Sequence, residues 1–186
     1  MKKVITIVSL SLVGMLILTT IILACITVGK IPAFETPTNL VVYSDELDGV
    51  NKSNENASIT KVQDLMKNGV KQKLLQSWFG GTIDNMSVET TEGTNYTVSR
   101  KNSDVTKVVF EYKYGDDKKS IKIEGKSYDY YSIIFQVSDS QSRSVMTAYL
   151  IDSKPGDTAS FHTKVMIEGN FTDLYLAVRA LIESHI

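Results

Sequence analysis

The residue types that most often carry out chemistry are few and scattered in this chain of 186 residues. Its two histidines, His162 and His185, lack a Cys, His or carboxylate neighbour at a spacing typical of metal ligands. Asp116 and Asp117 are adjacent carboxylates, but they fall in an expected turn, where aspartate is favoured for backbone geometry. The sequence therefore predicts no catalytic residues, no metal ligands, no cofactor and a protein that is not an enzyme.

The remaining chemical candidate is Cys25, the single cysteine, which lies in the stretch IILACITVGK. The letters ILAC resemble the box that ends a bacterial lipoprotein signal, which makes Cys25 a candidate lipidation site. However, Leu23 is bulkier than that box usually allows, and the residues after Cys25 continue the apolar run. We therefore favour Cys25 as a small apolar residue of a membrane helix. A lipoprotein signal and a cleaved secretory signal are the two alternatives, in that order.

Residues 4–29 form an uncharged and mostly apolar run at the start of the chain. A bilayer core about 30 Å thick is spanned by ~20 apolar residues in a helix, and a cleavable signal usually has an apolar core of only about 7–15 residues. Lys2 and Lys3 precede the run, and the positive-inside rule places them in the cytoplasm. The sequence thus predicts a single-pass or lipid-anchored protein of the cell membrane, which contacts the bilayer through residues 4–29 and exposes residues 31–186 outside the cytoplasm.

The composition of the exported part limits its partners. All 21 acidic residues of the chain lie in residues 31–186, whereas Lys2, Lys3 and Lys30 precede this part, so it is acidic on balance. A nucleic-acid partner is not expected, because such partners require concentrated positive charge. The exported part contains no cysteine, so it has no internal disulfide and depends on its hydrophobic core. This favours a bacterial cell-surface protein over an animal extracellular module.

The exported part carries the patterns of both strands and helices. Residues 39–44 are rich in β-branched side chains and read as a short strand. From Ile59 onward apolar residues recur at spacings of three and four, which predicts an amphipathic helix over residues 60–79. A second amphipathic helix is expected after Asn170, whose side chain suits the N-cap position.

Between these helices, from residue 82 onward, the apolar period falls to two, which is typical of antiparallel strands with one buried face. Hairpin connections are expected around Glu92 and around Asp116, where turn residues cluster. On the strand after residue 143 we expect three side chains to face the core, namely Val145, Tyr149 and Ile151. On the charged strand that precedes Asp116 we expect Glu111 to face solvent.

These elements predict an anchor or signal segment at residues 1–30, a linker at 31–38 and an extracytoplasmic α+β domain at 39–186. The domain is expected to have two layers, a meander sheet of about seven antiparallel strands packed by one N-terminal and one C-terminal amphipathic helix. The order of strand, helix, meander and helix resembles helix-grip folds, and it is also similar to cystatin-like and nuclear-transport-factor-like folds. This resemblance concerns topology alone and implies no function.

An aromatic segment near residue 130 supplies the candidate binding surface. In one continuous strand Tyr128, Tyr130 and Ile134 share a face, and they form an outward patch if the opposite face is core. Tyrosines on an exposed strand suit recognition, because they bury much area at little entropic cost. We therefore predict a non-catalytic, membrane-anchored binding domain of a cell-envelope protein, which contacts a protein partner at the cell surface through these three residues. Cross-strand packing of the tyrosines is the competing interpretation.

The alternative function is a carrier of a small molecule or lipid. A small apolar ligand would occupy a pocket between the sheet and the helices, because apolar concave sites with few polar groups are typical of such ligands. The side chains expected to line that pocket are Trp78, Phe110, Tyr112, Tyr131, Phe135, Tyr149 and Phe161. The same side chains would also serve an ordinary filled core.

Overall fold

The computed structural model describes residues 2–28, 31–43, 50–51, 56–70, 72–73, 86–90, 96–100, 106–138, 144–154 and 160–184. The chain falls into two compact units. One unit comprises residues 1–29 and 71–84, and the other comprises residues 30–70 and 85–186.

The smaller unit contains helix α1 (Lys2–Cys25) and a two-stranded sheet. In this sheet β1 (Thr27–Val28) pairs antiparallel with β4 (Gln72–Lys73). The helix agrees with the apolar run at the start of the sequence, and its described side chains at residues 11–22 are exposed. Among the residues that the structure describes, no helix combines the length and the apolarity that crossing a membrane requires.

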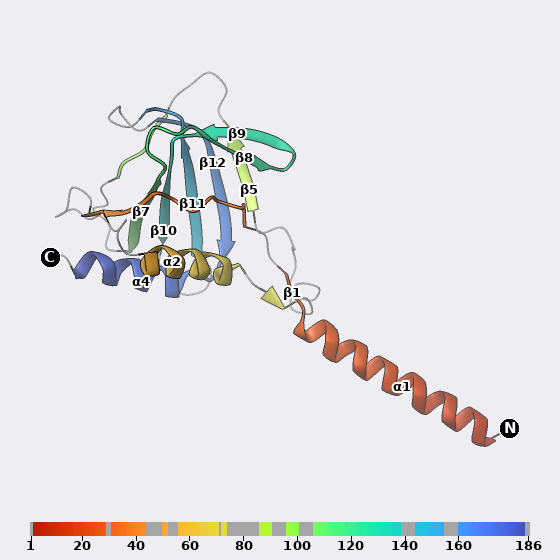
Figure 1. Ribbon diagram of the computed structural model, residues 1–186. Helices are drawn as coiled ribbons and strands as arrows, with labels where there is room; N and C mark the ends of the chain where they lie inside the picture. The colour runs from red at the N-terminus through yellow and green to blue at the C-terminus, as the bar shows by residue number, and fades with distance from the viewer. Residues whose placement is uncertain are drawn as a thin grey trace. The chain divides into compact units, whose positions relative to one another are not determined.

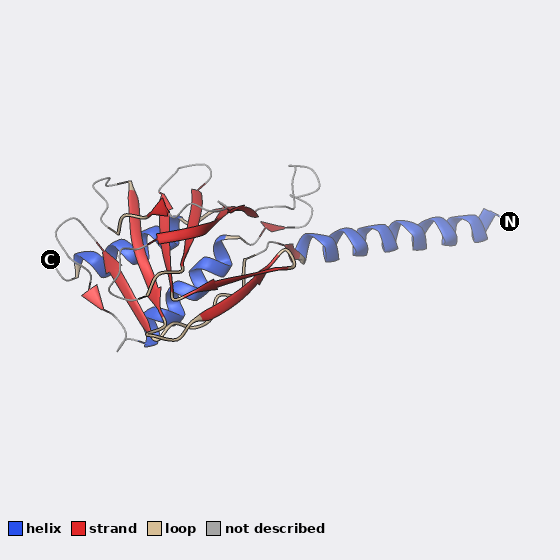
Figure 2. Ribbon diagram, turned by 90° about the horizontal axis from the view of Figure 1, so that it is seen from above, coloured by secondary structure: helices blue, strands red, loops and turns tan. Residues whose placement is uncertain are grey.

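The larger unit is an α+β domain whose central sheet has eight strands, so the predicted fold class and the antiparallel sheet packed by helices are confirmed. In spatial order the strands are β3 (Val50–Asn51), β2 (Asn39–Tyr43), β7 (Lys107–Lys113), β10 (Ser132–Ser138), β11 (Ser144–Ile151), β12 (Ser160–Gly169) and β5 (Met86–Thr90), while β6 (Tyr96–Thr97) also pairs with β12. Helices α2 (Asn56–Gly69) and α4 (Thr172–Glu183) lie next to each other across these strands (Figures 1 and 2).

Both predicted hairpins are wrong, because the strands on either side of each turn pair elsewhere. β5 and β6 do not pair with each other: both pair with β12, β5 through Val165 and β6 through Phe161. Similarly, β7 pairs with β2 and β10, whereas β8 (Lys119–Ile123) pairs with β9 (Lys126–Tyr130) in a separate two-stranded sheet. The connection between β8 and β9 has positive φ angles at Glu124 (51°) and Gly125 (84°), as a tight two-residue hairpin turn requires.

Helix α2 confirms the apolar period but not the predicted end at residue 79. Its buried side chains include Ile59, Val62 and Met66, and the helix ends at Gly69. The carbonyl oxygen of Gly69 accepts a hydrogen bond of 2.8 Å from the backbone N–H of Asn170, and a Cβ atom at Gly69 would overlap the ring of Phe171. The Asn170 N–H thus satisfies the carbonyl of the last residue of α2, and the lack of a side chain at Gly69 lets the two backbones approach.

Helix α4 starts one residue later than predicted. Phe171 occupies the N-cap position, and Oδ1 of Asn170 accepts a hydrogen bond of 3.3 Å from the N–H of Thr172. The Phe171 N–H donates instead to the buried hydroxyl of Ser144, at 2.6 Å, and this hydroxyl donates to the carbonyl of Gly169, at 3.3 Å. A β11 side chain thus satisfies backbone groups at the start of the helix, which fixes α4 to the sheet.

The segment expected to be a linker, residues 31–38, has no helix or strand but packs against the domain. The ring of Phe34 meets Phe135 edge-on, with the ring centres 5.2 Å apart. The backbone carbonyl of Glu35 accepts a hydrogen bond of 2.9 Å from the Tyr114 hydroxyl. These contacts tie residue 34 to β10 and residue 35 to the residue that follows β7.

The sheet buries side chains on both faces. On the face covered by α2 and α4, a large apolar cluster contains Val42, Phe110, Phe135 and Leu150. On the opposite face a smaller cluster is built from Val41, Tyr43, Val98, Val109, Ile134 and Ile151. Because successive strand residues alternate between faces, β2, β7 and β10 each supply both clusters.

The predicted inner face of β11 is wrong. Met146, Ala148 and Leu150 are the residues that point toward the helices, and Tyr149 and Ile151 point to the other face. An apolar period of two cannot decide the face when both faces of a strand carry apolar side chains, as they do here.

Candidate functional site

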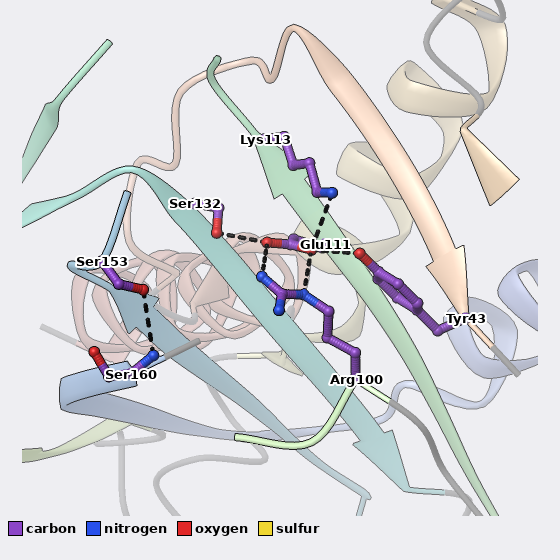
Figure 3. A network of polar contacts seen from close by, with 7 residues as sticks. All are labelled: Tyr43, Arg100, Glu111, Lys113, Ser132, Ser153 and Ser160. Atoms are coloured by element: carbon purple, nitrogen blue, oxygen red, sulfur yellow. Dashed lines mark hydrogen bonds and ion pairs between the residues drawn. The ribbon is translucent and has the colours of Figure 1, made fainter. Parts of the chain in front are cut away.

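The face of the sheet opposite the helices contains a buried carboxylate, Glu111, in the middle of β7. The neighbouring residues on β7, Phe110 and Tyr112, belong to the large apolar cluster, so the strand alternation directs Glu111 away from the helices. The prediction that Glu111 faces solvent is therefore wrong. Arg100, which follows β6, reaches over this face and points its guanidinium at Glu111 (Figure 3).

The Glu111 carboxylate accepts four short hydrogen bonds. Its Oε2 accepts from the Tyr43 hydroxyl at 2.6 Å and from Arg100 Nε at 2.9 Å. Its Oε1 accepts from the Ser132 hydroxyl at 2.6 Å and from a terminal nitrogen of Arg100 at 3.1 Å. The Nζ atom of Lys113 lies 3.8 Å from Oε2, at the edge of this network (Figure 3). These partners come from β2, β7, β10 and the segment after β6, so the network joins elements far apart in sequence.

The network determines which protonation states are stable. Burial alone would raise the pKa of Glu111, but the hydrogen bonds from Arg100, Ser132 and Tyr43 outweigh burial and lower it. The pKa of Tyr43 is raised, first by burial and then by the nearby negative charge of Glu111. The Arg100 pKa is also raised, since its bonds to Glu111 outweigh the opposing effect of its partial burial. At neutral pH Glu111 is thus an anion, held between the cationic Arg100 and the neutral phenol of Tyr43.

A pocket of about 230 Å³ opens beside this network. Its lining residues are Asn39, Arg100, Glu111, Lys113, Gly115, Tyr131, Ser132, Ile151, Ser153 and Lys154. Three of these side chains are cationic and one is anionic. Since Glu111 already holds a bidentate ion pair with Arg100, Lys113 and Lys154 add positive charge that no second carboxylate balances among the described residues of the lining.

The polar lining is positioned by the ends of four strands. Asn39 starts β2, Lys113 ends β7, Ser132 starts β10, and Ile151 ends β11. The segment after β11 is held to β12, because the Ser153 hydroxyl accepts a hydrogen bond of 3.3 Å from the Ser160 N–H (Figure 3). Because the Ser132 hydroxyl donates to Glu111, this arrangement offers the lysine ammonium groups and the Ser153 hydroxyl to a small anion, and a carboxylate is a suitable one.

The structure corrects the predicted recognition patch. Tyr130 and Ile134 are both 0 % exposed, and they lie in different apolar clusters, while Tyr128 is half-buried against the large cluster. The reason is a break at Tyr131, which separates β9 from β10 and interrupts the alternation assumed for one continuous strand. These three side chains therefore form no outward patch together. The Tyr130 hydroxyl has no hydrogen-bond partner among the described residues, and burial raises its pKa to about 12.

The predicted carrier pocket is divided by the sheet. Phe110, Tyr112 and Phe135 pack together on the helix face, with ring centres 4.8–5.8 Å apart. Tyr149 and Phe161 meet on the opposite face, at 4.8 Å. Phe161 faces away from the helices because β12 is irregular at this point. Thr163 and Phe161, which are two residues apart, pair with the adjacent residues Leu150 and Ile151.

Of the other predicted residues, Tyr131 lines the polar pocket, whereas Trp78 lies outside the described residues. The side chain of Cys25 also lies outside them, so its lipidation stays a prediction. The residues that sequence reasoning missed are Arg100, Glu111, Lys113, Ser132 and Lys154. A weak signal existed for Glu111, since it alternates with Val109 along a strand whose other face is also apolar.

Within the described residues, no group of three or more His, Cys, Asp or Glu side chains could hold a metal ion. No family model matches this chain, and no curated protein or solved structure shows a significant match to it. The features of this chain that bear on function are therefore the polar pocket and the sequence.

Proposed function

We propose that the protein is a non-catalytic binding domain that holds a carboxylate group of a protein partner in the polar pocket beside Glu111. One observation carries this proposal: Lys113 and Lys154 line a pocket in which the one carboxylate among the described residues is already paired with Arg100. An anionic ligand would balance that charge. The volume of about 230 Å³ suits a terminal or side-chain carboxylate better than a large cofactor.

The state of Glu111 favours binding over catalysis. A general base needs a free lone pair and a pKa near the working pH. The Glu111 carboxylate is saturated by four donors, and its pKa is lowered. Its role in this proposal is to fix Arg100 and Ser132, so that the lining is preorganised before the ligand arrives.

The proposed location is the outer face of the cell membrane. The support comes from the sequence, in which residues 4–29 carry no charge and follow Lys2 and Lys3. A domain tethered there would meet acidic segments or free C-termini of other envelope proteins. We also propose that the curved sheet and α4 form a helix-grip-like arrangement, a finer statement than the α+β class.

The test is a titration of the full chain, reconstituted in phosphatidylcholine nanodiscs, with a short peptide that ends in Ala-Ala. One form of the peptide has a free C-terminal carboxylate and the other is amidated. The free-acid form should bind at least tenfold more tightly, because only it carries the negative charge. Nuclear magnetic resonance shifts of residues around Lys113 and Ser132 would report the site.

Lys154→Glu should weaken binding of the free-acid peptide about tenfold, since it reverses a charge of the pocket lining. The matched control is Lys126→Glu, at an exposed position at the start of β9. It should change the affinity less than twofold. Equal binding of the two peptides, or equal effects of the two substitutions, would contradict the proposal.

A further inference from the structure

A second pocket, of about 340 Å³, lies on the other side of the sheet, where residues 31–36 pass over α2. Its lining residues are Ile31, Pro32, Ala33, Phe34, Thr36, Gln63, Met66, Lys67 and Tyr112. None of them lines the polar pocket, so the two sites are separate. The volume falls within the range of about 300–1,000 Å³ that is typical of small-molecule sites.

The interior of this second pocket is apolar. Ile31 and Phe34 are half-buried against the large cluster, and Met66 is 2 % exposed. The one polar group at depth is the Tyr112 hydroxyl, which donates to the Sδ atom of Met66 at 3.4 Å. A thioether is a weak acceptor, and burial raises the pKa of Tyr112, so this phenol stays neutral. Such a surface suits a hydrocarbon chain.

Among the described residues, the polar side chains of the pocket are few and include a single charge. Gln63 donates to the Thr36 hydroxyl at 3.3 Å, which links α2 to the segment that covers it. Lys67, in the last turn of α2, is exposed and is the one charged residue among those described in the lining. The pocket therefore combines an apolar interior with one cation, which is the complement of a single-chain anion.

We propose that this pocket binds a fatty acid, with its hydrocarbon chain against Ile31, Phe34 and Met66 and its carboxylate beside Lys67. The volume admits a single chain, whereas a two-chain phospholipid would need more room. That a membrane supplies the fatty acid rests on the proposed membrane location. Only Lys30 separates Ile31 from the uncharged run at residues 4–29. A bilayer would then hold fatty acids close to this segment of the chain.

The test uses the full chain in phosphatidylcholine nanodiscs and a dodecanoate probe with a photoreactive diazirine at its terminal carbon. After irradiation, mass spectrometry of the peptides locates the cross-links. We expect them on residues 31–36 and on Met66. Unlabelled fatty acids should compete more strongly as their chains lengthen, by roughly fourfold for each methylene that becomes buried.

Two charge reversals on the same helix separate specific binding from partition into the bilayer. Lys67→Glu should lower cross-linking in the pocket at least tenfold, whereas Lys61→Glu, exposed on α2 outside the pocket, should leave it within twofold. With the unchanged chain, the methyl ester of the probe should give as little cross-linking in the pocket as the acid gives with the Lys67→Glu variant. Equal yields for both variants would overturn the inference, as would cross-links confined to residues 4–29.

A third variant keeps this result separate from the proposed function. Lys154→Glu changes the polar pocket and should not alter cross-linking to Met66. Cross-links that appear near Lys113 and disappear in Lys154→Glu would place the probe in the polar pocket, which would support carboxylate binding there and overturn the fatty-acid site. Failure of the peptide titration with normal labelling of Met66 would overturn only the carboxylate pocket.

Discussion

The two faces of the central sheet bury different kinds of side chains. The face under α2 and α4 is apolar, and its stacked rings Phe110 and Phe135 lie 4.8 Å apart. The opposite face has a smaller apolar cluster and a buried ion pair between Glu111 and Arg100. One strand, β7, supplies both, so the difference arises between residues that are adjacent in sequence.

The comparison shows what each face contributes. The burial of apolar side chains is favourable and does not depend on their orientation, so the helix face supplies most of the stability. A buried carboxylate is costly unless it is paired and hydrogen-bonded, so the other face gains a fixed geometry in place of net stability. That geometry holds Ser132 and Arg100 at the rim of the polar pocket. The stable face and the face that carries the proposed carboxylate pocket are thus opposite sides of one sheet.

The largest expected effect is on the helix face. Phe135→Ala should lower the free energy of unfolding by about 4 kcal/mol, because it removes a fully buried ring and leaves a cavity between Phe34, Phe110 and Tyr112. Equilibrium urea unfolding of the full chain, followed by circular dichroism, would measure it. Phe161→Ala, at a half-buried ring on the opposite face, should cost less than half as much. Equal costs would show that the faces do not differ as argued.

A smaller effect is expected from the ion pair. Arg100→Met leaves Glu111 buried without its cation and should lower the free energy of unfolding by about 3 kcal/mol. We place it at the low end of the range for broken buried pairs, because the Arg100 side chain is 32 % exposed. The double substitution Arg100→Met with Glu111→Leu should recover most of that loss, since it removes both charges. Additive losses in this double-mutant cycle would show that the two side chains do not act as a pair.

The smallest effect concerns pH. The pKa of Glu111 is lower in the folded protein than its ordinary value of 4.5, so its contribution to stability is present above that value and is lost as the pH falls through the folded pKa. Urea midpoints measured from pH 7 to pH 3 should therefore fall, and Glu111→Gln should flatten the curve. Asp129→Asn, at an exposed ion pair with Lys118, should flatten it less. A variant curve parallel to the wild-type curve would exclude Glu111 as a source of the acid sensitivity.

Local patterns predicted the elements better than their partners. The apolar spacing around Ile59, Val62 and Met66 correctly indicated a helix, and the alternation in β7 and β10 correctly indicated strands. The pairing of β5 and β6 with β12 could not be read from sequence, because it depends on which edge of the sheet is free. The end of α2 at Gly69 was also missed, since there the helix contacts Gly169 and Phe171, which lie about 100 residues later in the chain.

The candidate site was missed for a related reason. Arg100 and Glu111 look like solvent-exposed charges on a polar strand face, and only the packing of Val98 and Tyr43 beside them makes that face an interior. The prediction of the recognition patch was wrong for a different reason, a break in the strand. Tyr130 was assigned to the surface by strict alternation, but the break at Tyr131 places it in the core.

The sequence by itself determined the α+β class, the two amphipathic helices of the domain and the uncharged segment before it. These features depend on periods of two or about 3.6 residues and on local composition, which act over a few neighbours. Tertiary structure alone decided which face of each strand is buried, where α2 ends and which charges meet. These outcomes depend on contacts between distant segments, and the Glu111 network, assembled from β2, β7, β10 and the residues after β6, forms only when those segments come together.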